Sequence, residues 1–311
     1  MNNNILGLHH ITAIAGNAQQ NLDFYTKVLG QRLVKKTVNF DDPGTYHFYF
    51  GNETGTPGTI LTFFPWQNIS KGKNGTGMAT EISYTVPAGS LEFWKARFKQ
   101  FNVPYEETIE RFGDKVLRFS DPDGLQLSFV ETPAADNRLP WETADIKKDA
   151  ATKGFHSTTL TLKNIEATAK VLTDLLGYTL QAQEGNRYRF AVDTVENANI
   201  IDLLATPDGD RGHNAAGTNH HVAFRVANDD IQMALREKIV AAGHHITPKI
   251  DRDYFYSLYF REPGGVLFEI ATDNPGFTVD EPLNELGTGL RLPKQYEPHR
   301  KEIEEVLPVL K

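Results

Sequence analysis

Hydrophobic and polar residues alternate in several short stretches of the chain, and a period of two residues predicts β-strands. In the first stretch Ile11, Ala13 and Ala15 share one face, and the residues between them share the other. Turn-forming segments such as Asp41-Asp42-Pro43-Gly44 separate the strand-like stretches that follow. Helices are predicted between some of the strands, one of them over Leu91–Phe101. The chain is therefore predicted to combine α-helices with β-sheet.

These predicted elements recur four times in the order strand, helix, strand, strand, strand. The modules run from His10 to Phe64, from Thr80 to Phe129, from Phe155 to Leu204 and from His221 to Ala271. Three of the predicted helices end at a glycine, which suits the left-handed backbone that commonly terminates a helix; these are Gly30, Gly177 and Gly243. The predicted fold class is therefore α+β, with four βαβββ modules.

Two modules are expected in each half of the chain, which places domains at residues 1–140 and 154–275. Residues 132–153 are rich in Ala, Asp, Lys and Pro, and we interpret them as a linker. Residues 276–311 form a tail outside the repeats. An amphipathic pattern in this tail predicts a docking helix whose apolar residues are Ile303, Val306, Leu307 and Leu310.

Two of the predicted strands begin with a pair of histidines. They are Leu8-His9-His10-Ile11-Thr12 and Asn219-His220-His221-Val222-Ala223-Phe224. A third strand, Val266–Ala271, places Glu269 among apolar residues. Because successive side chains point to opposite faces of a strand, His10, His221 and Glu269 are expected opposite the apolar faces. We expect the apolar faces to pack under helices and the opposite faces to share a cavity.

Two imidazoles and one carboxylate from three strands form the facial triad that is typical of non-haem iron sites. The triad His10, His221 and Glu269 would leave other coordination positions of a divalent metal open, with His9 and His220 beside the metal. A lone histidine is more often an ordinary residue at a strand edge. The coincidence on three strands favours a metal site.

The repeats provide an internal comparison for this assignment. When Asp121-Pro122-Asp123-Gly124 is set over Glu262-Pro263-Gly264-Gly265, Ser128 falls at the position of Glu269. Aligning the helix ends places Ser157 at the position of His10. Modules two and three are therefore predicted to lack the ligands. Module one must then meet module four around the metal, which leaves modules two and three to pair with each other.

Composition excludes several other classes of function. The chain has 311 residues, 40% of them hydrophobic and 23% charged, and a formal net charge of −8. No basic face for nucleic acid is indicated, and no apolar stretch approaches membrane-spanning length. The absence of cysteine excludes disulfides, thiol nucleophiles and cysteine-ligated metals. The polar start Met1-Asn2-Asn3-Asn4 is not that of a signal peptide, so a cytoplasmic protein is expected.

The chain resembles the vicinal oxygen chelate superfamily, which includes glyoxalase I, bleomycin- and fosfomycin-resistance proteins and extradiol dioxygenases. Within it, the resemblance is greatest to ring-cleaving dioxygenases that act on hydroquinones. It covers nearly the whole chain, and its most specific stretches are Leu8–Thr12, Leu33–Pro43, Gly58–Trp66, Phe260–Thr272 and Leu292–Arg300. The resemblance implies that residues 1–140 and 154–275 are glyoxalase-like domains of two modules each.

The resemblance also implies a cofactor and substrates. The expected metal is one Fe(II) per chain, with Mn(II) as the alternative, and the expected substrates are a small aromatic compound and O2. His10, His221 and Glu269 fall on the ligand positions of the family. Residues beside the metal or the substrate are implied at His9, Thr12, His220, Arg252 and Tyr259. No departure from the family pattern is visible at the ligand positions, and the oligomeric state stays open, a homo-oligomer included.

The chemistry of these residue types agrees with those roles. Imidazoles titrate near neutral pH, so His9 and His220 are candidate bases for a hydroquinone hydroxyl. Tyr259 is a candidate hydrogen-bond donor to the substrate or to oxygen, and Arg252 could offset developing negative charge. The residues alone favour plainer interpretations, in which Arg252 pairs with a neighbouring aspartate, Asp251 or Asp253, and Tyr259 packs as a strand aromatic.

Several similar features are given less weight. His244-His245-Ile246-Thr247 repeats the first histidine motif, but it follows a helix end and is interpreted as the start of another strand. The segment Phe63-Phe64-Pro65-Trp66 is interpreted as core, and His213 as a loop residue. His47 is expected in a sheet, near the site if module one lines it.

Three classes of function remain. The favoured one is a ring-cleaving dioxygenase that opens the ring next to a hydroxyl-bearing carbon. The second is a glyoxalase or thiol-transferase type of metalloenzyme, but modules two and three offer only serines where glyoxalase I has further ligands. The third is a metal-free resistance protein that binds a small molecule, against which the intact ligand set argues.

Overall fold

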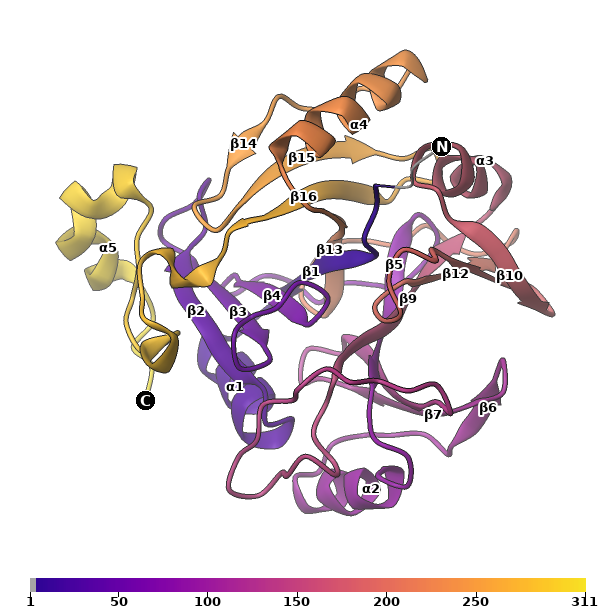
Figure 1. Ribbon diagram of the computed structural model, residues 1–311. Coiled ribbons are helices and arrows are strands. Elements are labelled where there is room, and N and C mark those ends of the chain that lie inside the picture. Colours follow the sequence, from indigo (N-terminus) through magenta and orange to yellow (C-terminus); the bar gives the residue numbers. More distant parts are fainter. Residues whose placement is uncertain (1–3) are drawn as a thin grey trace.

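The computed structural model describes residues 4–311, so the start of the polar segment, residues 1–3, lies outside the described residues. Two eight-stranded sheets form the body of the protein (Figure 1). One sheet has the strand order β14-β15-β16-β13-β1-β4-β3-β2, and the other β10-β11-β12-β9-β5-β8-β7-β6. The α+β class and the four βαβββ modules are confirmed.

Modules one and two contain the first eight strands. The elements of module one are β1 (Leu8–Ala15), α1 (Ala18–Asp23), a π-helical turn (Phe24–Val28), β2 (Arg32–Val38), β3 (Tyr46–Gly51) and β4 (Ile60–Pro65). Those of module two are β5 (Met78–Thr85), α2 (Leu91–Gln100), β6 (Ile109–Arg111), β7 (Asp114–Ser120) and β8 (Gln126–Glu131).

Modules three and four repeat this order. Module three contains β9 (Gly154–Leu162), α3 (Glu166–Lys170), a π-helical turn (Val171–Leu175), β10 (Thr179–Glu184), β11 (Arg187–Ala191) and β12 (Ile200–Ala205). Module four contains β13 (Thr218–Val226), α4 (Asp229–Ala241), β14 (Ile250–Asp251), β15 (Phe255–Arg261) and β16 (Leu267–Pro275). In modules one and three the helix ends in a π-helical turn, in which adjacent residues such as Phe24 and Tyr25 are both buried.

The pairing of modules follows the distribution of the candidate ligands. Each sheet joins one module from each half of the chain, module one to module four and module two to module three. At the centre of the first sheet β1 is antiparallel to β13, and β13 is parallel to β16. The register sets Thr12 opposite His221 and Ala223 opposite Glu269. The three strands that carry the candidate ligands are therefore neighbours, as the repeats predicted.

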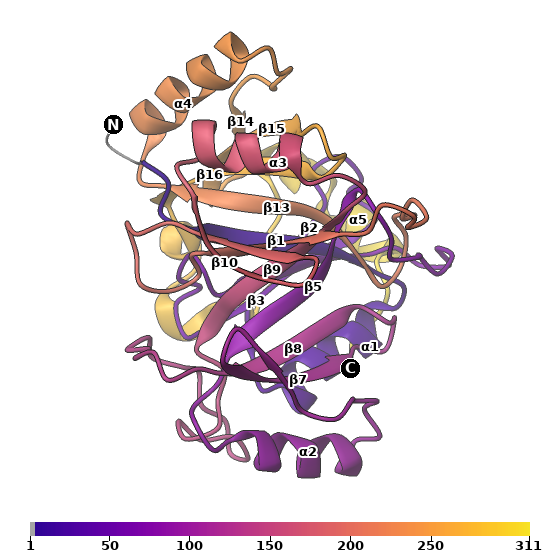
Figure 2. The ribbon, with the colours of Figure 1, turned by 90° about the vertical axis from the view of Figure 1, so that its right-hand side faces the viewer.

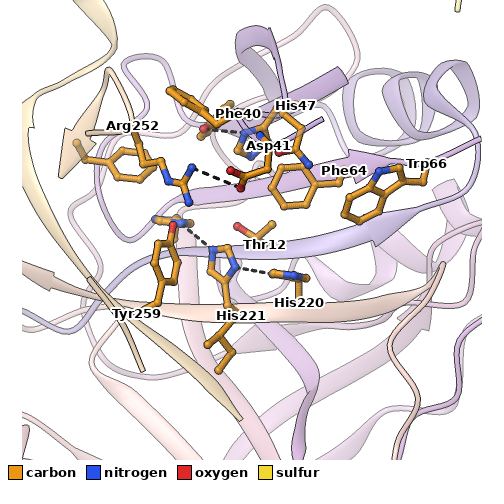
Figure 3. Close-up of a pocket in the computed structure, with 15 residues that line it drawn as sticks. Thr12, Phe40, Asp41, His47, Phe64, Trp66, His220, His221, Arg252 and Tyr259 are labelled. Atoms are coloured by element: carbon orange, nitrogen blue, oxygen red, sulfur yellow. Dashed lines mark hydrogen bonds and ion pairs between the residues drawn. The ribbon is translucent and has the colours of Figure 1, made fainter. Parts of the chain in front are cut away.

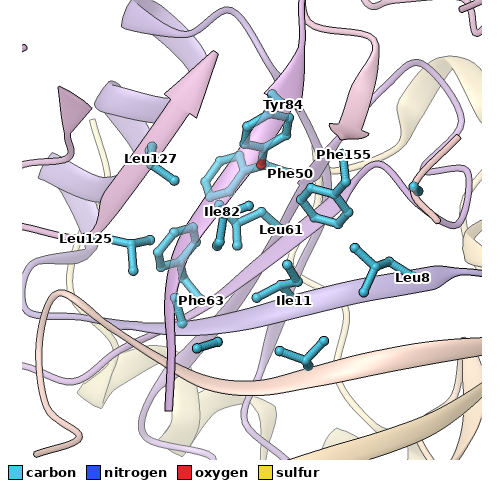
Figure 4. Packing of buried hydrophobic residues seen from close by; sticks show 14 of the residues in the cluster. Leu8, Ile11, Phe50, Leu61, Phe63, Ile82, Tyr84, Leu125, Leu127 and Phe155 are labelled. Carbon is cyan, nitrogen blue, oxygen red and sulfur yellow. The ribbon is translucent and has the colours of Figure 1, made fainter. Parts of the chain in front are cut away.

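The hydrophobic core joins the two sheets as well as the helices. Figure 4 shows Leu8 and Ile11 of β1 beside Leu61 and beside residues of the second sheet such as Ile82 and Phe155. The expected cover of helices is present too, since Tyr25 packs on Phe63 with ring centroids 4.6 Å apart. The apolar face of β1 is thus buried, and the opposite face is left for polar residues.

The segments outside the modules pack against them. Residues 132–153 contain no strand or helix, but Ile146 is fully buried against Gly30 and Ala150 accepts a hydrogen bond from Trp94 Nε1 at 3.0 Å. The boundaries 1–140, 154–275 and 276–311 stay predictions. No helix in residues 4–311 is long and apolar enough to cross a membrane.

The tail is made of short helices that lie beside module one (Figure 1). They are 3-10 turns at Phe277–Val279, Leu283–Glu285 and Lys294–His299, followed by α5 (Arg300–Val306). Ile303 and Leu307 are buried, whereas Val306 is 65% exposed, so its predicted inward orientation is wrong. Ile303 is the buried residue of the helix, and Leu307 is buried from the extended segment that follows it, so the four apolar residues do not share one helical face.

A buried carboxyl group links module one to module two. Asp121 accepts hydrogen bonds from the backbone amides of Asp123 and Leu125 and from the Tyr25 hydroxyl at 3.2 Å. Burial raises the pKa of Asp121 to about 7, although these donors oppose the shift. The next turn residue, Asp123, accepts from the backbone amide of Gly16 at the end of β1. This turn therefore holds β1 against the second module.

Asp121→Asn is expected to stabilise the protein at alkaline pH. Because the pKa of Asp121 is raised in the folded state, its contribution to stability is full below about pH 4 and is lost as the pH rises through about 7. Asparagine keeps an acceptor for the two amides and carries no charge. Urea unfolding at pH 5 and pH 8 should show a difference between variant and wild type that grows by roughly 2 kcal/mol towards pH 8. A difference independent of pH would contradict the assignment.

Candidate metal centre

Three buried side chains converge on one face of the first sheet. The Nε2 atoms of His10 and His221 lie 3.2 Å and 2.9 Å from Oε2 of Glu269, and 3.3 Å from each other. All three are buried, Glu269 completely. Within residues 4–311 this is the only cluster of His, Cys, Asp and Glu that could hold a metal ion, with its ligand atoms within 4.8 Å of one another. The structure thus brings together the three residues that the strand periodicity selected.

The chemistry of this cluster fits a divalent cation. Oε2 of Glu269 is buried and accepts no well-directed hydrogen bond, although two imidazole nitrogens face it. Burial opposes ionisation of Glu269, but the two imidazoles outweigh burial and hold the pKa of this carboxyl well below its usual range. A buried carboxylate and two imidazole nitrogens that converge on one point suit a divalent cation, to which each Nε2 would offer its lone pair.

Neighbouring side chains fix the orientation of each candidate ligand. Nδ1 of His10 lies 2.9 Å from Nδ1 of His9, and Nδ1 of His221 lies 2.8 Å from Nδ1 of His220. When Nε2 holds a metal, Nδ1 carries the proton, so each preceding histidine is assigned the acceptor role. Oγ of Ser257 on β15 donates to Oε1 of Glu269, the oxygen that does not face the imidazoles.

Burial favours the uncharged form of the neighbouring histidines. Burial lowers the pKa of His220 to about 3, helped by His221 and Arg261. Burial likewise places the pKa of His9 and of His47 well below the usual value, and lowers that of His221. Neutral imidazoles are the form that ligates a metal or accepts a proton.

The candidate ligands face a cavity of about 300 Å³ (Figure 3), which we call the substrate cavity. Aromatic side chains form much of its wall: Phe40, Phe64, Trp66 and Phe255. The polar part of the wall includes Thr12, Asp41, His47, Tyr49, His220, Arg252 and Tyr259. A cavity of this size with an aromatic wall and a few convergent polar groups suits a single substituted ring.

The predicted neighbours of the metal fall into two groups. Thr12, His220, Arg252 and Tyr259 line the substrate cavity. His9 is not among the lining residues. It lies behind His10, with its ring 5.0 Å from that of Phe255 and a hydrogen bond to the backbone of Thr272. Its geometry suits the positioning of His10 better than contact with a substrate.

Arg252 makes contacts that the sequence did not predict. Its guanidinium carbon lies 5.4 Å from the ring centroids of both Phe40 and Tyr259, and Nη1 is 3.8 Å from Asp41 Oδ2. The plainer interpretation, a pair with Asp251 or Asp253, is therefore wrong about the partner. Asp41 belongs to the loop between β2 and β3, which sequence spacing could not place beside β14.

Other predictions for this region had mixed outcomes. Phe63 is core, but Phe64 and Trp66 line the substrate cavity, so the interpretation of that segment as core is wrong for these two residues. His47 lies in β3 and lines the cavity as expected. His245 is exposed and outside the cluster, and the predicted strand at this motif is reduced to a bridge between Ile246 and Phe260.

A chain of hydrogen bonds along the cavity was not predicted. It runs from Thr12 to Thr62 at 2.8 Å, from Thr62 to His47 at 2.9 Å, and from His47 to the Tyr49 hydroxyl at 3.0 Å. The sequence could have indicated that His47 and Tyr49 lie together, because residues two apart on a strand point to the same face. Nothing in the sequence indicated this for Thr62 and Ser257, because their hydrogen bonds depend on which strands become neighbours.

Among the described residues the second sheet carries no cluster of His, Cys, Asp and Glu that could hold a metal ion. Its registers place Glu81 at the position of His221, Ser128 at that of Glu269 and Ser157 at that of His10. Glu81 pairs with Arg111 at 2.8 Å and accepts from Ser128 at 2.9 Å. In module two, the residue that corresponds to the candidate ligand His221 of module four is therefore held in an ion pair with Arg111.

Two sheets of βαβββ modules, the first of which carries the one histidine–histidine–glutamate cluster of residues 4–311, define a vicinal oxygen chelate protein. The model of the Glyoxalase/Bleomycin resistance protein/Dioxygenase superfamily matches residues 7–129 and 154–270. The chain belongs to this superfamily, and the resemblance found in the sequence is confirmed.

Relatives of similar length carry dioxygenase names. A Bacillus subtilis (strain 168) protein named "Putative ring-cleaving dioxygenase MhqO" is 49% identical over 304 residues, 97% of this chain and 96% of that protein. The chlorohydroquinone/hydroquinone 1,2-dioxygenase of Sphingobium indicum is 38% identical, covering 96% and 94%. The crystal structure of a Bacillus subtilis "putative dioxygenase", 47% identical, superposes with a TM-score of 0.95 over 99% of this chain and 98% of that one.

Proposed function

We propose that the protein is a metal-dependent dioxygenase that opens the ring of a hydroquinone-type diol next to a hydroxyl-bearing carbon. The observation that carries the proposal is the buried cluster of His10, His221 and Glu269 facing a cavity with an aromatic wall. The names of relatives that span nearly the whole chain support the reaction class and the substrate class. A cytoplasmic location is proposed with it.

His10 Nε2, His221 Nε2 and Glu269 Oε2 would hold one Fe(II) per chain, with Mn(II) as the alternative. Bound there, such a metal brings the substrate oxygen and O2 together and takes part in the transfer of electrons between them. His9 and His220 hold the two imidazoles in place through Nδ1, and Ser257 holds the carboxylate through Oε1.

The wall of the cavity binds and orients the ring. Phe64 and Phe255 offer faces and edges to an aromatic substrate, and the site excludes bulk water around the triad. The Arg252 guanidinium stabilises the anion that forms when a substrate hydroxyl loses its proton. Burial raises the pKa of Tyr259 above its usual value, so its hydroxyl stays protonated and donates a hydrogen bond to a substrate oxygen. Nδ1 of His220 accepts from His221, so its Nε2 carries the proton, and His220 is proposed to donate this hydrogen to a substrate oxygen.

The overall reaction balances without another reagent. One carbon–carbon bond of the ring breaks, and both oxygen atoms of O2 enter the product. The hydroxyl-bearing carbon becomes a carboxyl group and its neighbour a carbonyl group. The ring loses four electrons and O2 gains them, and at neutral pH the new carboxyl group releases its proton.

A para diol is expected to be a better substrate than a catechol. The two hydroxyls of a hydroquinone lie at opposite ends of the ring, so one oxygen alone reaches the metal, and wall residues must orient the rest. Tyr259 and Arg252 are placed for that task. Oxygen uptake by Fe(II)- and Mn(II)-loaded protein should give a higher kcat/KM for hydroquinones, and Tyr259→Phe should lower it roughly tenfold or more with full metal content.

A catechol with a clearly higher kcat/KM than every hydroquinone tested would overturn the substrate class and leave the reaction class standing. His220→Ala is the companion variant, expected to retain metal and to lose turnover. Metal analysis of His220→Ala protein distinguishes a direct effect on turnover from the loss of bound metal.

A further inference from the structure

A second cavity adjoins the candidate metal centre from the side of the second sheet. It has a volume of about 390 Å³ and shares His220, His221 and Leu267 with the wall of the substrate cavity. The rest of its wall comes from the start of β5, from the loop before β13, from Asn219 at the start of β13, from Arg261 at the end of β15 and from the turn before β16. We call it the polar chamber. The two imidazoles therefore separate two cavities of different character.

The polar chamber is cationic. Arg211 and Arg261 line it together with His213 and Asn214, and no carboxylate is among its lining residues. Within residues 4–311 neither arginine takes part in an ion pair, and Arg261 Nη1 donates only to the backbone oxygen of Gly265 at 2.6 Å. Both arginines are exposed, so their free N–H groups are available to an anion that enters from solvent.

The wall of this chamber is fixed by backbone and buried side chains. Asn219 is buried and donates from Nδ2 to the backbone oxygen of Ala79 at 3.1 Å, which ties β13 to β5. Gly77 and Gly265 lie next to each other with positive φ angles of 84° and 105°, and a Cβ on Gly77 would lie 3.1 Å from the Gly264 oxygen. The chamber is thus a built feature at the junction of the two sheets.

We propose that the polar chamber binds the carboxylate of the ring-opened product. This inference rests on the proposed function. The substrate is a neutral aromatic diol and suits the aromatic wall of the substrate cavity. The product carries a new carboxylate, and the one guanidinium among the lining residues of that cavity, Arg252, already faces Asp41 at 3.8 Å. Arg211 and Arg261 supply the opposite charge on the other side of His220 and His221.

The second sheet offers a comparison in which arginines line a cavity without being free. Arg111 and Arg118 pair with Glu81, Arg118 also pairs with Glu106, and Arg187 pairs with Asp202. That cavity of about 760 Å³ has as many carboxylates as guanidiniums around it and no connection to the metal ligands. Arg118→Gln is therefore a matched control for the loss of one arginine from a cavity wall.

The test uses cis,cis-muconate, a stable six-carbon ring-opened dicarboxylate, and the Mn(II)-loaded protein. Isothermal titration calorimetry at low and at high salt measures its Kd for wild type, Arg211→Gln/Arg261→Gln and Arg118→Gln. The double variant is expected to bind muconate roughly tenfold more weakly and with less dependence on salt. Its metal content and its KM for hydroquinone should equal those of wild type, and Arg118→Gln should bind as wild type does.

Muconate binding that is unchanged in the double variant would overturn the inference, and would mean that the carboxylate binds at the metal or in the substrate cavity. Equal weakening in Arg118→Gln would overturn it too, since the effect would then be one of overall charge. Oxygen uptake with hydroquinone is measured on the same samples. If the protein turns over hydroquinone but the double variant binds muconate as wild type does, the inference about the polar chamber is rejected and the proposed function stands. If no diol is turned over, the proposed function is rejected, and the assignment of the product with it.

Discussion

Glu269→Ala protein is expected to purify without bound metal and to lose turnover by roughly a thousandfold or more. Glu269 supplies the only carboxylate of the cluster, at 2.9 Å and 3.2 Å from the two imidazole nitrogens, and without it two neutral imidazoles remain to hold a divalent cation. His10→Ala and His221→Ala should have the same effect. The measurement is metal content per chain after anaerobic loading with Fe(II) or Mn(II), followed by oxygen uptake with hydroquinone.

His245→Ala is the matched control, because His245 stands in the same His-His-Ile-Thr motif but is exposed and outside the cluster. It should retain metal and activity. The ligand variants should keep the far-ultraviolet circular dichroism of wild type, since the site occupies a cavity wall and the core lies on the other face of β1. Full metal retention in Glu269→Ala protein would count decisively against the triad.

Lys35→Met is expected to destabilise the fold by about 3 kcal/mol. Lys35 has a completely buried side chain, and its ammonium group contacts Glu281, also completely buried, and Asp280 of the tail. It also lies 4.8 Å from the ring centroid of Tyr254. Methionine fills a similar volume but leaves a buried carboxylate with one remaining cation, Arg291, at 3.3 Å. Because Arg291 remains as a partner, the expected loss of stability is at the lower end of the range for a broken buried ion pair.

Urea unfolding of wild type and variant at neutral pH measures this loss. The double variant Lys35→Met/Glu281→Gln provides the control, because it removes the unpaired charge together with its partner and should recover part of the lost stability. A Lys35→Met protein as stable as wild type would show that the tail does not depend on this pair. The result matters for the site, because the tail also holds the loop of Phe40 through a hydrogen bond from the Tyr296 hydroxyl.

The triad was predictable because it depends on a local rule. The period of two residues selects His10 over His9 and His221 over His220, and the repeats show that modules one and four must meet. Both conclusions need only the sequence within each strand and the comparison between modules. The same alignment identified Ser157 and Ser128 as the residues of modules three and two that stand where modules one and four carry His10 and Glu269.

The rest of the cavity wall depends on contacts between distant segments. Asp41 meets Arg252 across 211 residues of chain (252 minus 41), and Trp66 reaches the cavity from the loop after β4. Their sequence neighbourhoods resemble those of ordinary turns and core strands. His9 shows the converse case, because its position beside a ligand suggested a catalytic base, whereas its ring packs on Phe255 behind the ligand. Val306 was misplaced because the apolar pattern was interpreted as one helical face through Leu310, whereas the helix ends at Val306 and Leu307 is buried from the extended segment after it.

Incorporation of isotope-labelled dioxygen tests the central claim most directly. Fe(II)- or Mn(II)-loaded protein is mixed with hydroquinone under labelled O2, and the ring-opened product is reduced at once with borohydride to prevent exchange of its carbonyl oxygen with water. The account predicts consumption of one O2 per hydroquinone, with one labelled atom in the carboxyl group and one in the alcohol formed from the carbonyl group. Product that forms under argon, or that carries no label, would contradict it.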